Sequence, residues 1–219
     1  MKRKYKILFV IVTLLAASLG CNVLSALPGN GPLLEDDFSS GEGWGTRTDS
    51  DSSIDFSDGG LRMQLFKENY FVWSTPNAEK YENIHVEVTV KNNNTPATTA
   101  FGVLCHQQVV NDSFYYFAIT PAGEYAIVKA ALAQTDVFLT NNDQWATSDL
   151  ITKDAPSYRV GADCGSGTLT LYVDGKQVAS ISDLTYTSGT VGLLTWSGEQ
   201  ASSADVTFDD FVVTKLQQQ

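Results

Sequence analysis

The strongest constraint on the fold is a period of two in the hydrophobic residues after residue 34. Apolar and polar side chains alternate in segments 61–65, 84–90 and 168–173, as they do in strands with one buried face. The clearest turn is Asp174-Gly175, a pair that favours a type I′ hairpin turn. About fourteen short strands separated by turns predict an all-β fold, a two-sheet antiparallel β-sandwich.

The N-terminus has a different pattern. Lys2, Arg3, Lys4 and Lys6 precede an apolar run over residues 7–19, which is typical of a signal peptide. The run is shorter than the roughly 20 apolar residues of a membrane-spanning helix. We therefore expect a cleaved export signal and not an anchor helix.

Residues 17–21 read ASLGC and resemble the lipobox of bacterial lipoproteins, in which the cysteine receives diacylglycerol and becomes the new N-terminus. The resemblance implies lipidation of Cys21, anchoring to the membrane through this lipid, and an extracytoplasmic place in the bacterial cell envelope. Ordinary signal-peptide cleavage after Ser18 is the alternative. The expected organisation is a lipoprotein signal peptide over 1–20, a lipidated tether over 21–33 and a β-sandwich domain over 34–216.

Charge narrows the choice of partners. Removal of residues 1–20 takes away four of the 14 basic residues and none of the 25 acidic ones, which leaves 10 against 25 and a net charge of −15. Nucleic acid is excluded as a partner, because its binding depends on Lys and Arg. Highly anionic polysaccharides are disfavoured for the same reason, and the sequence does not indicate an oligomeric state.

The two cysteines beyond the lipidation site can pair. Cys105 shares its strand face with Phe101 and Val103, and Cys164 shares its face with Val160. Both faces are expected to point into the core. Because disulfides persist outside the cytoplasm, we expect a Cys105–Cys164 disulfide. Two separate buried thiols are the alternative.

Several segments, in this order, carry a resemblance to a known superfamily. They are LEDDF at 34–38, NDSFYYF at 111–117, LTLYVDGK at 169–176, GTVGL at 189–193 and VTFDDF at 206–211. Together they resemble the concanavalin A-like lectin/glucanase superfamily, specifically its laminin G-like and glucanase-related domains. The resemblance implies a jelly roll of two curved sheets whose concave face often binds glycan.

Glucanases of this superfamily carry a Glu-x-Asp-x-Glu or Glu-x-Asp-x-x-Glu strand with two catalytic carboxylates. The best counterpart here is segment 86–91, where Glu87 is present but Thr89 and Lys91 replace the other carboxylates. We therefore expect that the protein is not an enzyme. The two histidines, His85 and His106, are expected on the solvent faces of strands.

Aromatic residues suggest a binding surface. Glycan sites combine aromatic platforms with a few polar side chains. Trp145 follows the polar residues 141–144, and Trp196 ends an apolar strand. For every candidate, packing in the core is the alternative. The carbohydrate-binding candidates are Trp73, Trp145, Trp196 and, from the aromatic run 114–117, Tyr115 or Tyr116.

Calcium is the expected cofactor, in a structural role. By resemblance Asp209 of the final strand would be a ligand, with Asp37, because calcium prefers carboxylate and carbonyl oxygens. The alternative is that Asp209 or Asp210 simply points outward on an edge strand.

Three function classes remain open from the sequence. The leading one is a cell-surface lipoprotein with a non-catalytic carbohydrate-binding domain. A structural or protein-interaction module of the envelope is the second, and a glycoside hydrolase with an unrecognised carboxylate pair is the third.

Overall fold

The computed structural model describes residues 31–76, 79–201 and 203–216. Within these ranges all regular structure is β, with sixteen strands and no helix. No helix in this part of the chain could therefore span a membrane. The expected signal peptide, Cys21 and residues 22–30 of the expected tether lie outside the described residues.

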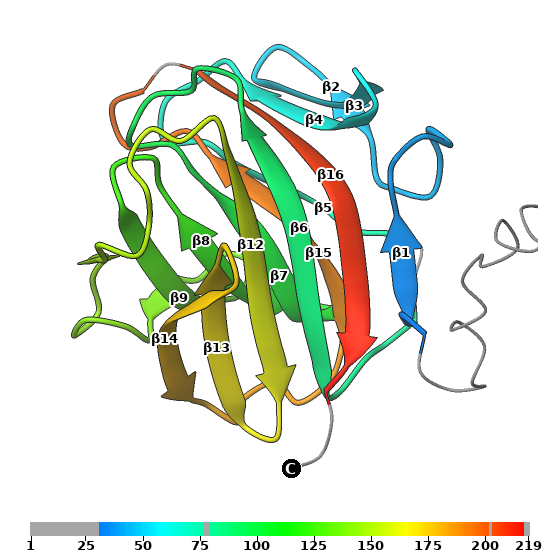
Figure 1. Ribbon diagram of the computed structural model, residues 1–219, viewed down its shortest axis with the longest axis vertical. Helices are drawn as coiled ribbons and strands as arrows, with labels where there is room; N and C mark the ends of the chain where they lie inside the picture. Colours follow the sequence, from blue (N-terminus) through cyan, green and yellow to red (C-terminus); the bar gives the residue numbers. More distant parts are fainter. Residues whose placement is uncertain (1–30, 77–78, 202, 217–219) are drawn as a thin grey trace, which may run out of the picture. The chain divides into compact units, whose positions relative to one another are not determined.

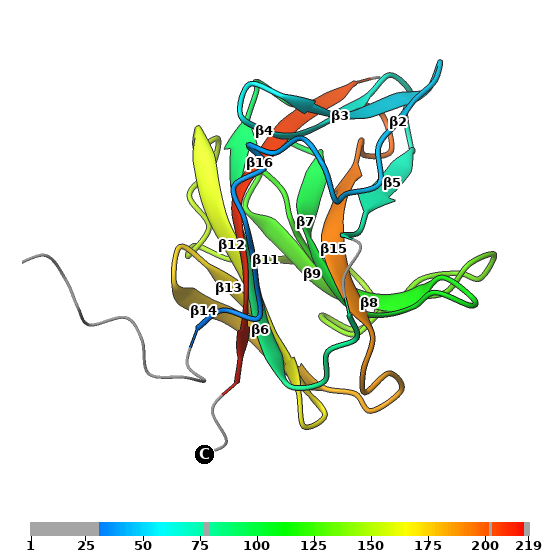
Figure 2. The same cartoon turned by 90° about the vertical axis from the view of Figure 1, so that its right-hand side faces the viewer.

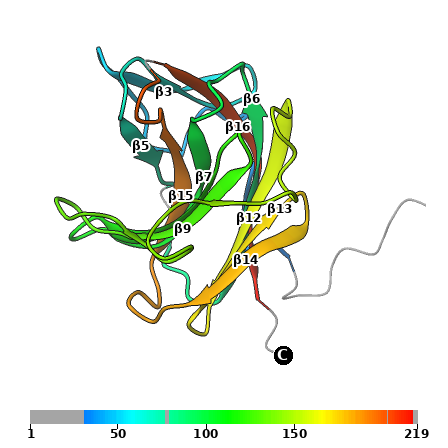
Figure 3. The same cartoon turned by 90° about the vertical axis from the view of Figure 1, so that its left-hand side faces the viewer.

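The strands form two sheets that lie face to face (Figure 1). All pairings between the strands are antiparallel. Figures 2 and 3 show the sheets edge-on, as two layers. The predicted two-sheet antiparallel sandwich is confirmed.

The first sheet has nine strands in the order β14-β13-β12-β6-β16-β4-β3-β2, with β1 paired to β16. Its strands are β1 (Leu34–Asp36), β2 (Arg47–Thr48), β3 (Ser52–Ser57), β4 (Gly60–Leu65), β6 (Ile84–Asn92), β12 (Ser157–Gly165), β13 (Thr168–Val173), β14 (Lys176–Ser182) and β16 (Ala204–Lys215).

The second sheet has seven strands in the order β10-β9-β8-β7-β15-β5, with β11 paired to β9. Its strands are β5 (Phe71–Ser74), β7 (Ala100–Gln108), β8 (Ser113–Ile119), β9 (Glu124–Ala130), β10 (Val137–Phe138), β11 (Ala146–Thr147) and β15 (Thr190–Trp196).

The core lies between the two sheets and follows the period of two. Val86, Val88 and Val90 of β6 point into it, and Phe101 and Val103 of β7 approach from the other sheet. Alternate residues on β6 stay partly exposed. Burial of these apolar side chains is the main stabilising force of the sandwich.

The predicted hairpin at Asp174-Gly175 joins β13 to β14. Both residues have positive φ, 49° for Asp174 and 74° for Gly175. A type I′ turn needs positive φ at both central positions, and Asp-Gly tolerates this better than most pairs. The turn is therefore confirmed.

Cys105 of β7 and Cys164 of β12 form a disulfide. Both cysteines point into the core, together with Phe101, Val103 and Val160, as their strand parity predicts. Because β7 and β12 belong to different sheets, the bond joins the two layers of the sandwich.

Candidate functional site

The outer face of the 7-stranded sheet is apolar, like its inner face. Strands β7 and β8 are buried along nearly their whole length, whereas an exposed face of an antiparallel sheet usually carries polar side chains. Most of these side chains are themselves buried, and they form a second apolar cluster on this side of the sheet. We call this surface the aromatic face, and its members are Phe71, Trp73, Ala100, Leu104, Phe114, Tyr116, Ala118, Ala126, Val128, Ala130, Phe138, Trp145, Leu194 and Trp196.

A cavity of about 510 Å³ opens on the aromatic face. This volume lies in the range of about 300–1,000 Å³ that is typical of small-molecule sites. Ala100 of β7 and Ala118 of β8 line it with small side chains, which leaves space above the central strands. Larger side chains complete the lining, the aromatic ones being Phe71, Tyr116, Phe138, Trp145 and Trp196 and the polar ones Asn69, Asp136, Asp143, Gln144 and Glu199.

A left-handed turn precedes Trp145. Asn141, Asn142 and Asp143 have φ values of 47°, 54° and 67°, a conformation that Asn and Asp adopt more readily than other non-glycine residues. The Asn141 side-chain amide donates a hydrogen bond to the main-chain oxygen of Trp145, at 2.6 Å. The main-chain N–H of Phe138 donates to Asp143 Oδ1, at 2.9 Å. These bonds hold the loop that presents Trp145 to the cavity.

Trp145 and Trp196 form the main aromatic pair of the cavity. Their ring centroids are 6.1 Å apart and their planes differ by 11°. Phe138 packs edge-on against Trp145, with centroids 5.8 Å apart. The indole N–H of Trp196 donates to Asn69 Oδ1 at 3.2 Å. Aromatic faces beside polar side chains suit a ligand with both apolar and hydroxylated surfaces.

Tyr116 and Asp136 form the most buried polar pair of the cavity. The Tyr116 hydroxyl donates a hydrogen bond to Asp136 Oδ2 at 2.9 Å. Burial raises the pKa of Asp136, and the hydrogen bond from Tyr116 offsets this only in part. Burial and the neighbouring Asp136 raise the pKa of Tyr116, so the phenol stays protonated and remains a donor.

The cavity brings together three of the predicted aromatic residues. Trp145, Trp196 and Tyr116 all line it. Trp73 lies on the same face, with its ring 5.9 Å from Phe71 and 5.8 Å from Phe114, but it lines a separate shallow hollow along β5. Trp73 is therefore outside the cavity.

Tyr115 is a correction to the sequence prediction. Its side chain points to the inner face of β8 and is fully buried in the core. Its hydroxyl donates to Asp183 and accepts from the main-chain N–H of Tyr186. Neighbouring residues of a strand face opposite sides, so Tyr115 cannot share the cavity with Tyr116.

Sequence reasoning missed Asn69, Phe71, Asp136, Phe138 and Glu199. Phe71 had a usable signal, because it stands two residues before Trp73 and so shares its strand face. Glu199 follows Trp196 in a polar loop. Asn69 and Asp136 lie in short connections, and Phe138 lies in the two-residue strand β10. None of them has a local pattern, and only the tertiary fold brings them to the cavity.

The strand that best corresponds to the glucanase pattern, β6, belongs to the other sheet. Glu87 of β6 lies on the outer face of the 9-stranded sheet, where Arg159 donates to its Oε1 at 2.8 Å. His85 is beside it, with Nδ1 2.7 Å from Asp163 Oδ1. The side chains that β7, β8 and β15 present to the cavity are Ala100, Tyr116, Ala118, Leu194 and Trp196. Its carboxylates thus come from loops and not from central strands.

His106 differs from the expectation of a solvent-facing side chain. It is 2% exposed, and its ring nitrogens lie 3.0 Å from the main-chain oxygen of Tyr186 and 2.8 Å from that of Glu82. The pairing of β7 with β8 is irregular between Cys105 and Gln108. Such a bulge redirects side chains and breaks the simple alternation of faces.

The two expected calcium ligands have separate contacts. Asp37 Oδ1 accepts a hydrogen bond from the main-chain N–H of Ser39 at 3.0 Å. Asp209 Oδ2 is 3.3 Å from the ammonium of Lys91. Within the described ranges, no three His, Cys, Asp or Glu side chains form a group that could hold a metal ion. Calcium binding at Asp37 and Asp209 stays a prediction.

Known structures share this fold. A Bacillus subtilis protein of unknown function with a galectin-like fold matches with a TM-score of 0.63 and 13% identity, over 87% of this chain and 99% of that chain. The carbohydrate-binding module CBM66 from Bacillus subtilis matches with a TM-score of 0.58 and 12% identity, over 80% of this chain and 98% of the other. A Bacillus licheniformis β-glucanase matches with a TM-score of 0.57 and 12% identity, over 85% and 99%.

These likenesses define the class of the domain. It is a jelly roll of the concanavalin A-like type, as its sequence segments suggested. No protein-family model and no curated protein sequence matches the chain. Proteins with this fold include both carbohydrate-binding modules and glucanases, so function has to be argued from the cavity itself.

Proposed function

We propose that this protein binds a glycan in the cavity of the aromatic face. The observation that carries the proposal is the nearly parallel pair Trp145 and Trp196, with Asn69 and Gln144 among the polar side chains around it. Sugar rings have apolar C–H faces that pack on indoles and hydroxyl groups that bond to amides and carboxylates. The excess of acidic residues disfavours highly anionic glycans.

We infer that binding is not coupled to cleavage. The retaining glycosidase mechanism needs two carboxyl groups about 5–5.5 Å apart that flank one glycosidic bond. The cavity side of the central strands offers Ala100, Tyr116 and Ala118, and the Glu87 strand faces away on the other sheet. One observation favours the alternative, hydrolysis, because the raised pKa of Asp136 suits a general acid.

A glycan array with the purified full-length chain tests binding. We expect retention of a restricted group of neutral or basic glycans, and loss of this retention in Trp145→Ala. An array without any specific signal would contradict the proposal. Incubation with the retained polysaccharide then tests catalysis: release of reducing ends that Asp136→Asn abolishes would establish a hydrolase instead.

We also propose that the domain is held at the outside of the cytoplasmic membrane by lipid on Cys21. The support is the basic and apolar N-terminal sequence followed by the residues ASLGC. A tethered binding domain would capture or present glycan for neighbouring enzymes or transporters. The calcium expectation at Asp37 and Asp209 carries no part of this proposal.

A further inference from the structure

The charged side chains that line the cavity are all acidic. Three carboxylates, those of Asp136, Asp143 and Glu199, line it together with five aromatic rings. No Lys, Arg or His side chain lines it in the described part of the chain. No basic side chain lies within ion-pair distance of any of these three carboxylates among the described residues.

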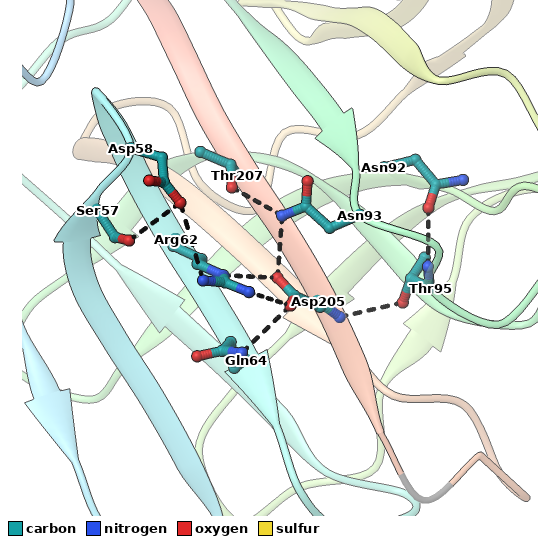
Figure 4. Close-up of polar contacts among 9 residues, drawn as sticks. All are labelled: Ser57, Asp58, Arg62, Gln64, Asn92, Asn93, Thr95, Asp205 and Thr207. Atoms are coloured by element: carbon teal, nitrogen blue, oxygen red, sulfur yellow. Dashed lines mark hydrogen bonds and ion pairs between the residues drawn. The ribbon is translucent and has the colours of Figure 1, made fainter.

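Several partly buried carboxylates elsewhere in the domain do have cationic partners. Asp205 binds the guanidinium of Arg62, at 2.8 Å and 2.5 Å, within a network that includes Asn93 and Gln64 (Figure 4). Asp183 is 3.0 Å from Lys129 Nζ. A partly buried carboxylate without a cation is costly, and Asp136 is such a group, whereas Asp143 and Glu199 are exposed to solvent.

The free-energy cost of a carboxylate without a cationic partner is clearest at Asp136. Its Oδ2 accepts the hydrogen bond from Tyr116, which is neutral and leaves the negative charge uncompensated. Burial raises the pKa of Asp136. A ligand cation beside it would favour the ionised carboxylate and reverse this effect.

The aromatic side chains of the cavity also favour a cationic ligand. Phe71, Tyr116, Phe138, Trp145 and Trp196 line the same cavity as the carboxylates. The negative face of an aromatic ring attracts a cation, and Trp is the strongest of these rings. A neutral sugar would satisfy the rings and hydroxyl partners but would cover the carboxylates without neutralising them.

We propose that the cavity binds a saccharide that carries a protonated amino group, and that Asp136, Asp143, Glu199 and the aromatic rings bind this ammonium. The inference rests on the proposed function, because it names the class of glycan for the same site. It predicts discrimination between a free amine and the same sugar with a hydroxyl or an acetamide in its place.

Calorimetric titration of the full-length chain tests this with a matched set of probes. Glucosamine, glucose and N-acetylglucosamine share one ring and differ only at position 2, and galactosamine with galactose repeats the comparison with the other configuration at position 4. We expect each free amine to bind about tenfold more tightly than its neutral counterpart, the factor that about 1.4 kcal/mol gives. The preference should shrink as salt rises from about 0.01 M to about 1 M, because the Debye length falls from about 30 Å to about 3 Å.

Variants that each remove one negative charge test which carboxylates bind the amine. Asp136→Asn keeps an oxygen that can accept the hydrogen bond from Tyr116, and Glu199→Gln alters an exposed side chain. Each should reduce the preference for the amine about fivefold, and the double variant more. Glu42→Gln removes one negative charge from an exposed loop outside the cavity and should leave the preference unchanged.

The outcomes separate this inference from the proposed function. Equal or tighter binding of glucose or N-acetylglucosamine would overturn the amino-sugar inference and leave glycan binding standing. If tetramethylammonium binds and none of the saccharides does, the assignment of a saccharide ligand is overturned in both proposals. If no probe binds and the glycan array is also blank, both proposals fail.

Discussion

The indole rings of Trp145 and Trp196 lie almost parallel, with 11° between their planes and 6.1 Å between their centroids. Trp196 ends β15, whereas Trp145 directly precedes β11 at the far side of the sheet order. Residues distant in sequence thus bring two nearly parallel rings to one cavity. This arrangement is the basis of the first prediction.

Removal of either ring should weaken glycan binding with little effect on folding. We expect Trp145→Ala and Trp196→Ala to lower the affinity for the best array glycan about tenfold, or about 1.4 kcal/mol, because each loses an apolar contact surface. Trp73→Ala is the matched control, since Trp73 belongs to the aromatic face but lies outside the cavity. If Trp73→Ala weakens binding as much as Trp145→Ala, the site has been placed wrongly.

The site could be predicted from sequence only where local context was informative. Trp145 stood out because it follows four polar residues. Tyr115 and Tyr116 could not be separated, because residues 114–117 are aromatic on both strand faces. The choice depends on which face of β8 meets the other sheet. Asp136 lies in a connection and has no local signal, since its importance comes from its hydrogen bond with Tyr116 of β8.

The Cys105–Cys164 disulfide should contribute substantially to stability. The two residues are 59 positions apart in sequence, and closure of a loop of this size typically stabilises a protein by about 2–4 kcal/mol. We expect reduction, or the double variant Cys105→Ala/Cys164→Ala, to lower the melting temperature. Thiol titration of the denatured, unreduced chain checks the pairing of these cysteines, and two free thiols from them would contradict it.

The fold was predictable where strands have one buried face. The alternation in β4 and β6 is visible in the sequence and matches their burial. Strands β2, β10 and β11 have only two residues each, which is too short for any period. The bulge at His106 was also invisible, since it depends on pairing between strands and not on composition.

Lipidation at Cys21 is a prediction from the N-terminal sequence alone. Mass spectrometry of the protein from a host that processes bacterial lipoproteins should show an N-terminal Cys21 with diacylglycerol. More than one acyl chain should anchor it stably, because a single chain gives only marginal binding. Cys21→Ser should release the protein from the membrane fraction. An unmodified N-terminus at Leu19 would refute the prediction.

His85 should make stability depend on pH near neutrality. Burial opposes protonation, but the hydrogen bond and charge of Asp163 and the charge of Glu87 outweigh it and raise the pKa of His85. The stabilisation is therefore fully present below the unfolded pKa of about 6.5 and is lost as pH rises through the folded pKa.

Substitution of His85 tests the direction of this pH dependence. We expect His85→Gln to cost about 1 kcal/mol in acid and less in alkali, because only the protonated ring makes charge-assisted bonds. Urea unfolding on both sides of neutrality measures the difference. A penalty that grows with pH would contradict the assigned direction.

Asp205 should contribute stability with the opposite pH dependence. Burial favours the neutral acid, but hydrogen bonds from Arg62 and Asn93 outweigh it and lower the pKa of Asp205. A lowered folded pKa gives a contribution that is present above the unfolded pKa of about 3.9 and is lost as pH falls through the folded pKa. We expect Asp205→Asn to cost about 2 kcal/mol near neutral pH, since it leaves Arg62 half-buried with only the more distant and exposed Asp58 as a carboxylate partner. In urea unfolding, the difference in the free energy of unfolding between wild type and variant should narrow as pH falls toward 2.

Asp174→Asn, at an exposed hairpin turn, is the control for the loss of one negative charge. Equal losses of stability in the two variants would show that the Asp205 network in Figure 4 adds nothing specific.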